Sequence, residues 1–414
     1  LDEEETRVLN YSSVVGRMFN TNLLESICFK NPYFFSIDKI SEALFKAEKL
    51  GIIRELEKGN YAFSSIAFKQ FLYDKLDSED RAMFHQLCGE YLEDNYGKEE
   101  ATIFELAYHY SHSDNLQRGI EYLKKAIEKS LDIASKSEAS LYCEQALETL
   151  KYMPDNNVNR NLKFEITFLY ARALYLFGNS NRGLEVLSSI QKDIDASNDK
   201  KSQAYFSYWI GTMSYLAGNQ IAAIMWFMKC IPIAEELGIY ELLSTPYQIV
   251  GGAYFFKGDL NTAIQYLNKS VQYIKDDDPY LYARTNGLLA WCHANVGQRK
   301  AALEDLKKAE ECLKFIIKPD LKIGIFHLIG SGYAWLNDIQ KCIYFENKVM
   351  EESSKTENQV MIYSAQYGLS LGYYRHGDNE KAIEYSIKGL EYSEKFGTKV
   401  GIHLFHMGIA GPSL

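Results

Sequence analysis

The sequence is short of proline and has no long apolar run, and both shortages exclude whole classes of protein. Only 7 of its 414 residues are proline, which suits a mostly helical chain because proline breaks helix interiors. The longest apolar stretch, Ile221–Ala234, is interrupted by Lys229 and is shorter than the roughly 20 residues that span a bilayer. We therefore expect a cytoplasmic protein with no membrane partner.

Cysteine is also scarce and scattered. The chain has seven cysteines, an odd number, and no two of them form a CxxC pair, so neither a disulfide framework nor a zinc site is expected. The sequences HExxH, GxSxG and the phosphate-binding GxxxxGKS or GxxxxGKT do not occur. The histidine pairs His109/His112 and His403/His406 have helical spacing but no third ligand close by in the sequence. We expect no metal, no cofactor and no enzymatic activity in this chain.

Positive charge is in deficit. Lys and Arg number 45 against 55 Asp and Glu, so the formal net charge is -10. The first 96 residues contain 11 basic and 17 acidic residues, a net charge of -6. Proteins bind phosphate backbones with clustered cations, and an acidic surface repels them. We therefore expect no direct contact with nucleic acid.

What the sequence does contain is a repeat with a period of about 40 residues. A turn residue recurs at nearly constant intervals, at Gly178, Gly218, Gly258, Gly297, Asn337 and Gly377. Glycine and asparagine tolerate the left-handed backbone conformation found just after a helix. A small residue lies five positions after each turn residue, and another lies seven positions before it. Small side chains at both positions allow two antiparallel helices to cross closely.

This spacing resembles the tetratricopeptide repeat, with Tyr254, Tyr333 and Tyr373 at its aromatic position. HEAT and armadillo repeats also have periods of about 40 residues, but they lack the small–turn–small spacing. We therefore expect an all-α fold, a tetratricopeptide-like α-α superhelix over residues 161–414 with leading helices over 97–160. The spacing around Gly119 predicts that one helix, at about 120–130, serves two neighbouring copies.

The first 96 residues lack the repeat and predict a winged-helix-like domain. Residues 22–28 and 36–50 have helical patterns, and Ser36 offers N-cap chemistry to the second. Apolar residues then alternate on both sides of Gly59-Asn60, which predicts a small β-hairpin. A further helix is expected from about residue 66. The order helix, helix, hairpin is typical of a winged helix.

Five segments resemble motifs of the STAND signal-transduction ATPases. They are Tyr11–Phe19 (ASVLGRxF in the family), Tyr61–Leu76 (YxFxHxLxxxxxYxxL), Arg81–Leu87 (RxxLHxxL), Leu106–His109 (LAxH) and Gly119–Ala126 (AIxYLxxA). Ser65 departs from the pattern, because the family usually has histidine there. In these ATPases the winged helix follows the nucleotide-binding module and leads into a helical array.

The resemblance implies a sensor and transcription regulator rather than an enzyme. The chain begins with Leu1 instead of Met, and we expect it to be a piece of a longer protein whose nucleotide-binding ATPase module lies upstream. In the maltotriose-responsive activator type of the family the helical array is the sensor, and its ligand changes how the array packs on that module. Two alternatives stay open: a stand-alone tetratricopeptide scaffold or peptide-sensing regulator, and the repeat platform of an enzyme.

The ligand is expected in the concave groove, which the first helix of each repeat lines. Groove positions lie six and three residues before the small pre-turn residue, and one, four and five residues after it. They combine aromatic rings with a few hydrogen-bonding groups, as recognition surfaces do. For a protein, peptide or small-molecule inducer, the predicted binding residues are Arg172, Tyr175, Tyr205, Tyr208, Tyr215, Gln248, Phe255, Arg284, Trp291, Asn295, His327, Tyr367, Tyr374 and Arg375.

Three further groove positions are occupied by Phe168, Thr212 and Ser331. We expect one subset to face a single concave surface, away from the contacts between helices, and to touch the ligand: Tyr208, Gln248, Arg284, Trp291, His327 and Tyr367.

Overall fold

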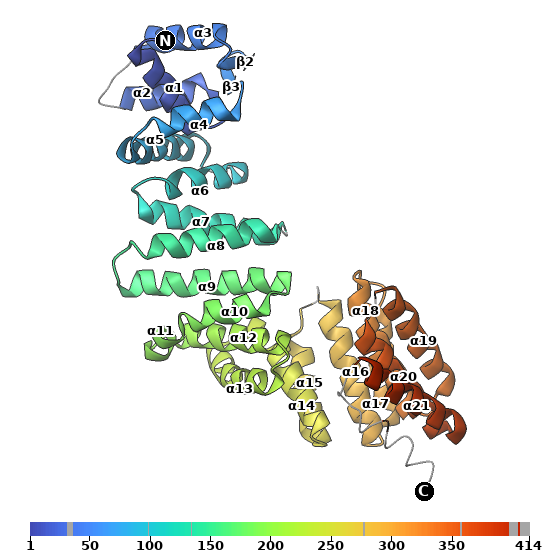
Figure 1. Ribbon diagram of the computed structural model, residues 1–414. Coiled ribbons are helices and arrows are strands. Elements are labelled where there is room, and N and C mark those ends of the chain that lie inside the picture. Colours follow the sequence, from blue (N-terminus) through green and yellow to red (C-terminus); the bar gives the residue numbers. More distant parts are fainter. Residues whose placement is uncertain are drawn as a thin grey trace. The chain divides into compact units, whose positions relative to one another are not determined.

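The computed structural model describes residues 1–30, 36–97, 99–133, 135–275, 278–356, 358–396 and 405. The chain folds into two compact units, residues 1–194 (unit 1) and residues 195–414 (unit 2), each built of stacked helices (Figure 1). The predicted boundaries at residues 96 and 160 rest on motifs and repeat phase, and they stay a prediction. None of the helices in the described ranges is both long and apolar enough to cross a membrane.

The N-terminal part of unit 1 has the predicted order of helices and hairpin. Its elements are α1 (Glu3–Val15), β1 (Met18–Asn20), α2 (Thr21–Lys30), α3 (Ile37–Lys49), β2 (Ile53–Glu57), β3 (Asn60–Phe63), α4 (Ile66–Asp74) and α5 (Ser78–Tyr96). The side chain of Ser36 accepts a hydrogen bond from the Lys39 amide and so caps α3, as predicted. The sheet has the order β1-β3-β2. The sequence did not predict β1, because three residues are too few to show a strand pattern.

A chain of hydrogen bonds joins three residues of the STAND-like motifs. The hydroxyl of Tyr73 on α4 is hydrogen-bonded to Nε2 of His85 on α5 at 2.9 Å. The Nδ1 atoms of His85 and His109 are 3.0 Å apart, and His109 donates to the carbonyl of Val15 at the end of α1. Both rings are buried. Ser65, where the family has histidine, takes no part in this chain and instead caps α4 by accepting from the Ala67 amide.

The tautomers of both rings follow from this chain. The carbonyl of Val15 can only accept, so a neutral His109 uses its proton there and accepts at Nδ1 from the Nδ1–H of His85. Nε2 of His85 then accepts from the hydroxyl of Tyr73. Both imidazoles are neutral, and each ring has one donor and one acceptor in use. The described residues contain no cluster of three His, Cys, Asp or Glu that could hold a metal, and His403 and His406 lie outside them.

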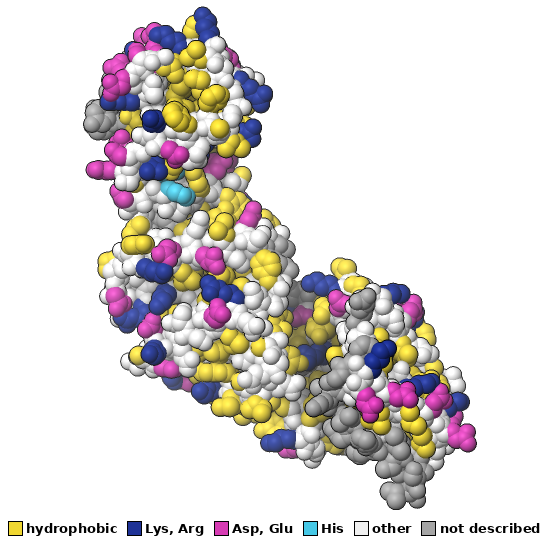
Figure 2. Space-filling view, viewed as in Figure 1, with side chains coloured by type: hydrophobic (Ala, Val, Ile, Leu, Met, Phe, Trp, Pro, Cys, Tyr) yellow, Lys and Arg dark blue, Asp and Glu magenta, His cyan; other side chains and the backbone are white. Residues whose placement is uncertain are grey.

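The rest of unit 1 is helical. After the turn η1 (Glu100–Thr102) come α6 (Ile103–Ser111), α7 (Leu116–Asp132), α8 (Lys136–Leu150), α9 (Asn157–Phe177), α10 (Ser180–Ser188) and α11 (Gln191–Ala196). Helix α7 packs against both α6 and α8, and the expectation that it serves two neighbouring repeat copies stays a prediction. On the face that Figure 2 shows, the basic and acidic side chains of this unit are interspersed.

Unit 2 is a series of antiparallel helix pairs. The pairs are α12 (Lys200–Leu216) with α13 (Gln220–Leu237), α14 (Ser244–Phe256) with α15 (Leu260–Tyr273), α16 (Pro279–Asn295) with α17 (Arg299–Cys312), α18 (Pro319–Trp335) with α19 (Ile339–Lys355), and α20 (Gln359–His376) with α21 (Asn379–Phe396). The short turn η2 (Tyr240–Leu242) precedes α14. Among the described residues all strands lie before residue 64, and the predicted all-α repeat array is confirmed.

The six predicted turn residues all have a left-handed backbone, with φ between 58° and 91°. The residue that follows most of them caps the next helix; Asn219, for example, accepts from the Ala222 amide and Asp259 from the Thr262 amide. The small residues before the turn are needed where helices cross. A side chain added at Gly211 would collide with Phe227, and one added at Gly251 would collide with Leu267.

Replacing Gly258 with valine should destabilise unit 2 by about 1 kcal/mol or more. The φ of Gly258 is 82°, and nothing lies within 4 Å of an added Cβ, so the cost comes from the backbone and not from crowding. The matched control is Lys257→Val, because Lys257 is exposed and has a φ of -76°. Thermal melting of the two variants measures the difference. Equal melting temperatures would show that the left-handed turn does not carry the predicted strain.

Candidate functional site

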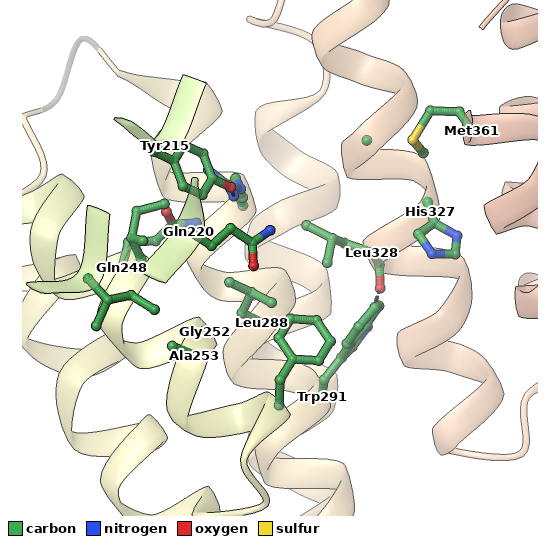
Figure 3. A pocket seen from close by; sticks show the side chains of 15 residues that line it. Tyr215, Gln220, Gln248, Gly252, Ala253, Leu288, Trp291, His327, Leu328 and Met361 are labelled. Carbon is green, nitrogen blue, oxygen red and sulfur yellow. Dashed lines mark hydrogen bonds between the residues drawn. The ribbon is translucent and has the colours of Figure 1, made fainter. Parts of the chain in front are cut away.

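Unit 2 contains a cavity of about 340 Å³ that is lined mainly by the first helices of its pairs (Figure 3). Helices α12, α14, α16, α18 and α20 contribute to it, together with the start of α13. The lining residues are Tyr215, Gln220, Ile224, Gln248, Ile249, Gly252, Ala253, Phe256, Arg284, Leu288, Trp291, Gly324, His327, Leu328 and Met361. Its volume lies at the lower end of the range for small-molecule sites, about 300 to 1,000 Å³.

The lining residues repeat at helical spacing because each helix presents one face to the cavity. Arg284, Leu288 and Trp291 follow one another at four and three residues along α16. In Figure 3, Tyr215 and Gln248 lie at one end of the cavity and His327 and Met361 at the other, with Leu288 and Leu328 between them. The cavity thus has a polar end and an apolar middle.

Arg284 supplies positive charge to the polar end. Its guanidinium donates to the hydroxyl of Tyr215 and lies 5.5 Å from the centre of the same ring. This partner is neutral and occupies one of the five N–H donors of the guanidinium. Among the described residues no carboxylate forms an ion pair with Arg284. The ring of Tyr215 therefore holds the cation in place, and the other N–H groups of the guanidinium remain available to a ligand.

Gln248 is the most unusual side chain of the site. It is 0% exposed, and neither its amide nitrogen nor its amide oxygen has a hydrogen-bond partner among the described residues. A buried polar group without a partner costs about 1 to 3 kcal/mol. The side chain borders the cavity, but each amide atom has less than 1 Å² of exposed surface, so a molecule that enters the cavity pairs with them only after Gln248 turns toward it.

Trp291 is part of the contact between two helices. Its side chain is only 8% exposed, and its indole N–H donates to the carbonyl oxygen of Leu328 on α18 at 2.7 Å. Its ring also contacts Phe255 and His327. The prediction that Trp291 lies away from the contacts between helices is therefore wrong. The indole lines the cavity, and its hydrogen bond links α16 to α18.

His327, at the other end, is backed by a buried carboxylate. Nδ1 of His327 is 3.1 Å from both carboxylate oxygens of Glu346, and the Ser331 hydroxyl donates to the same group at 3.0 Å. Burial raises the pKa of Glu346, although His327 and Ser331 oppose the shift. Gly330 and Gly368 leave room for the carboxylate, because a side chain at either position would collide with it.

The structure brings five of the fourteen predicted binding residues to this cavity: Tyr215, Gln248, Arg284, Trp291 and His327. Phe255 reaches it only through its ring contact with Trp291, whose centroid is 5.7 Å away. Tyr205 and Tyr208 are half-buried against the core between α12 and α14, and the hydroxyl of Tyr205 donates to Glu241 at 2.7 Å. The role of each in binding stays a prediction.

The remaining predicted residues lie elsewhere. Asn295 is exposed and donates to the carbonyl of Trp291, and Tyr367 contacts the ring of Phe405. Tyr374 and Arg375 are exposed near the end of α20, as are Arg172 and Tyr175 on α9 in unit 1. Three further groove positions are buried in the structure: Phe168, Thr212 and Ser331.

The sequence reasoning missed two kinds of lining residue. Gly252 and Gly324 occupy predicted groove positions but were passed over, because glycine offers no side chain to a ligand. Ile249, Leu288 and Leu328 lie two residues before the small pre-turn residue, a position that the groove template leaves out. Their recurrence at this position in three successive repeats is the signal that could have identified them.

Unit 1 contains two larger cavities of about 580 and 650 Å³, one around β1, α5 and α6 and the other around α8, α9 and α10. In the cavity around α8, α9 and α10 the charged groups are largely paired. Arg182 lies close to Glu185 and Glu144, and Lys163 pairs with Asp193. The unit 2 cavity is the stronger candidate, because it is lined by a fully buried amide, that of Gln248, which has no partner among the described residues.

Together the turns, the crossing glycines and the helix pairs define the class of protein: the chain is an array of tetratricopeptide-like repeats with a small three-stranded sheet near its N-terminus. The tetratricopeptide repeat family matches residues 245–277, which contain most of α14 and all of α15. No curated protein sequence matches this chain significantly.

Solved structures give more particular likenesses. A STAND protein with a tetratricopeptide repeat sensor from Pyrococcus horikoshii has a TM-score of 0.53 and 14% identity, over 100% of this chain and 60% of that one. The chain thus spans less than two thirds of that protein. A Rap protein complexed with competence and sporulation factor has a TM-score of 0.49 and 15% identity, over 74% of this chain and 80% of that one. At 14% identity the likeness to the Pyrococcus horikoshii protein shows the helical repeat fold alone.

Proposed function

We propose that this chain is the sensor arm of a STAND-type signal-transduction regulator. It binds an inducer or partner at the concave face of its repeats and passes the signal to a nucleotide-binding module. The observation that carries the proposal is the buried amide of Gln248, which faces a cavity and has no partner among the described residues. The motif resemblance of the N-terminal segments supports the placement beside a nucleotide-binding module.

The cavity is well placed to convert binding into a change of helix packing. It is lined by residues from five successive helix pairs, on α12, α13, α14, α16, α18 and α20. A ligand that contacts several of these helices favours the arrangement in which all of them close on it. Because a ligand shifts a conformational equilibrium only by its differential affinity for the two states, contacts to several helices are what a sensor requires.

Filling the cavity should abolish binding while leaving the fold intact. Gly324 lines the cavity within α18, and nothing lies within 4 Å of a Cβ added to it. We expect Gly324→Phe to project a ring into the cavity without a clash. The matched control, Gly324→Ala, should bind normally and gain about 0.5 to 1 kcal/mol of stability, because alanine favours a helix more than glycine does.

Native mass spectrometry of protein reloaded with a small-molecule extract measures the result. Wild type and Gly324→Ala should carry an adduct that Gly324→Phe lacks. An adduct of equal occupancy in all three proteins, or in none of them, would contradict binding at this cavity.

A further inference from the structure

We propose that the unit 2 cavity binds an organic carboxylate with a neighbouring secondary amide and an apolar side chain. N-acyl amino acids and the C-terminal residue of a peptide share this chemistry. The inference rests on the proposed function, because it names the class of ligand for the same cavity. Three groups of residues specify the three parts of the ligand.

The guanidinium of Arg284 specifies an anion. It lines a largely apolar cavity, its partner Tyr215 is neutral, and most of its N–H donors are unused. A guanidinium binds planar carboxylates through two parallel hydrogen bonds, and phosphates in a similar way. A neutral sugar would leave this cation desolvated and without a counter-charge. The ligand therefore carries a negative group at the end of the cavity that Tyr215 occupies.

The amide of Gln248 separates a carboxylate with an amide from a simple phosphate. Its N–H groups need an acceptor and its oxygen needs a donor. A phosphate ester offers only acceptors at neutral pH, so the glutamine oxygen would stay unpaired in its complex. In an extended N-acyl amino acid the amide N–H and one oxygen of the residue's own carboxylate point the same way, so they can pair with the oxygen and the nitrogen of Gln248, and the second carboxylate oxygen remains for Arg284. In an N-acyl amino acid this amide is one carbon from the carboxylate.

The remaining walls specify a small apolar body with a single charge. Leu288 and Leu328 lie in the middle of the cavity beside the amide of Gln220 (Figure 3), and Ile224 and Ile249 add to its apolar lining. His327, at the far end, already faces the buried carboxylate of Glu346, so any positive charge that it holds is matched inside the protein. With a volume of about 340 Å³, the cavity suits one apolar residue and its acyl group better than a long chain.

The test is calorimetric titration of the full chain with N-acetyl-L-leucine and N-acetyl-L-phenylalanine. Replacing the carboxylate by a neutral amide should weaken binding at least about tenfold, or about 1.4 kcal/mol. Arg284→Gln should weaken binding of the carboxylates by a similar factor but leave the neutral amides unchanged. Lys300→Gln is the control, because Lys300 is an exposed cation of the same unit that neither lines the cavity nor belongs to the predicted binding residues.

Gln248→Met keeps the test decisive if the arginine variant does not fold. Methionine matches the length of glutamine and removes both unpaired atoms, so the variant should melt at the same or a higher temperature. It should nevertheless bind the N-acyl amino acids at least about tenfold more weakly. Equal binding by Gln248→Met and wild type would overturn the proposal.

Further titrations distinguish a peptide C-terminus from a free N-acyl amino acid as the source of the ligand. They also distinguish failure of this ligand class from failure of the proposed function. Acetyl-Gly-Gly-Leu binding more tightly than N-acetyl-L-leucine would identify a peptide end, and weaker binding would identify a free N-acyl amino acid. Suppose that wild type binds maltotriose or phenyl phosphate but no N-acyl amino acid, and that Gly324→Phe loses this binding. That result would overturn the ligand class and leave the proposed function standing. If no probe binds and Gly324→Phe carries the same adducts as wild type, the ligand class and the proposed function are both overturned.

Discussion

Acidification from pH 7 to pH 5 should destabilise unit 1 by about 4 kcal/mol, roughly 2 kcal/mol for each of two buried histidines. Burial lowers the pKa of His85 to about 2 and that of His109 to about 4, against 6.5 in an unfolded chain. Between pH 6.5 and the folded-state pKa the unfolded chain binds protons that the folded unit excludes. The stabilisation is present above pH 6.5 and is lost as the pH falls.

The hydrogen-bond chain explains why the folded unit resists these protons. A proton added to Nδ1 of His109 would place an N–H group against the Nδ1–H of His85, so this pair of nitrogens can hold only one proton between them. The positive groups that face the pair, Lys69 and Arg81, oppose a further charge, as does His112. No carboxylate is among the groups that act on the pKa of either ring.

Denaturant unfolding at pH 7 and pH 5, followed by hydrogen exchange of α5 and α6, measures the effect. His109→Gln should lose about half of the difference between the two pH values, whereas the exposed His376→Gln should keep all of it. Unit 2 provides an internal contrast. The pKa of Glu346 is raised by burial, so its contribution to stability is present below pH 4.5 and is lost as the pH rises. Equal free energies of unfolding for unit 1 at both pH values would contradict the neutral histidine chain.

Trp291→Ala should destabilise unit 2 by about 3 to 5 kcal/mol. The variant removes a buried indole, its hydrogen bond to the carbonyl of Leu328, and its ring contacts with Phe255 and His327. For a unit of this size the melting temperature should fall by roughly 10 °C or more. Ligand binding should be lost as well, because α16 and α18 are no longer held together.

Trp291→Phe is the matched control. It keeps an aromatic ring in place but cannot donate to Leu328, so it should lose the hydrogen bond, worth about 1 kcal/mol, and some packing. Thermal melting of the two variants, with calorimetric titration of the same samples, separates stability from binding. An unchanged melting temperature for Trp291→Ala, with binding lost, would show that the indole acts only as a ligand contact.

The features that the sequence predicted well are local ones. Gly258 and Asp259 specify a left-handed turn and the cap of the next helix within two positions, so the pattern can be recognised without knowing what surrounds it. The same holds for the hairpin turn at Gly59, where φ is 81°. Regular repetition along the chain then strengthened each local signal, which is why the helix pairs could be predicted.

The cavity could be predicted only in outline, because its properties depend on distant residues. Nothing near Gln248 in the sequence shows that its amide will lack a partner, since that depends on what α16 and α18 bring to it. The burial of Trp291 follows from Leu328, which lies 37 residues away. The pairing of His85 with His109 is likewise a tertiary contact, although the motif resemblance had marked both residues.

A crystal structure of wild-type protein purified without removal of small molecules tests the central claim most directly. The account predicts density in the unit 2 cavity that accepts hydrogen bonds from the guanidinium of Arg284 and completes both the nitrogen and the oxygen of the Gln248 amide. Separate water molecules on Gln248, with Arg284 paired to a carboxylate of the chain itself, would contradict it.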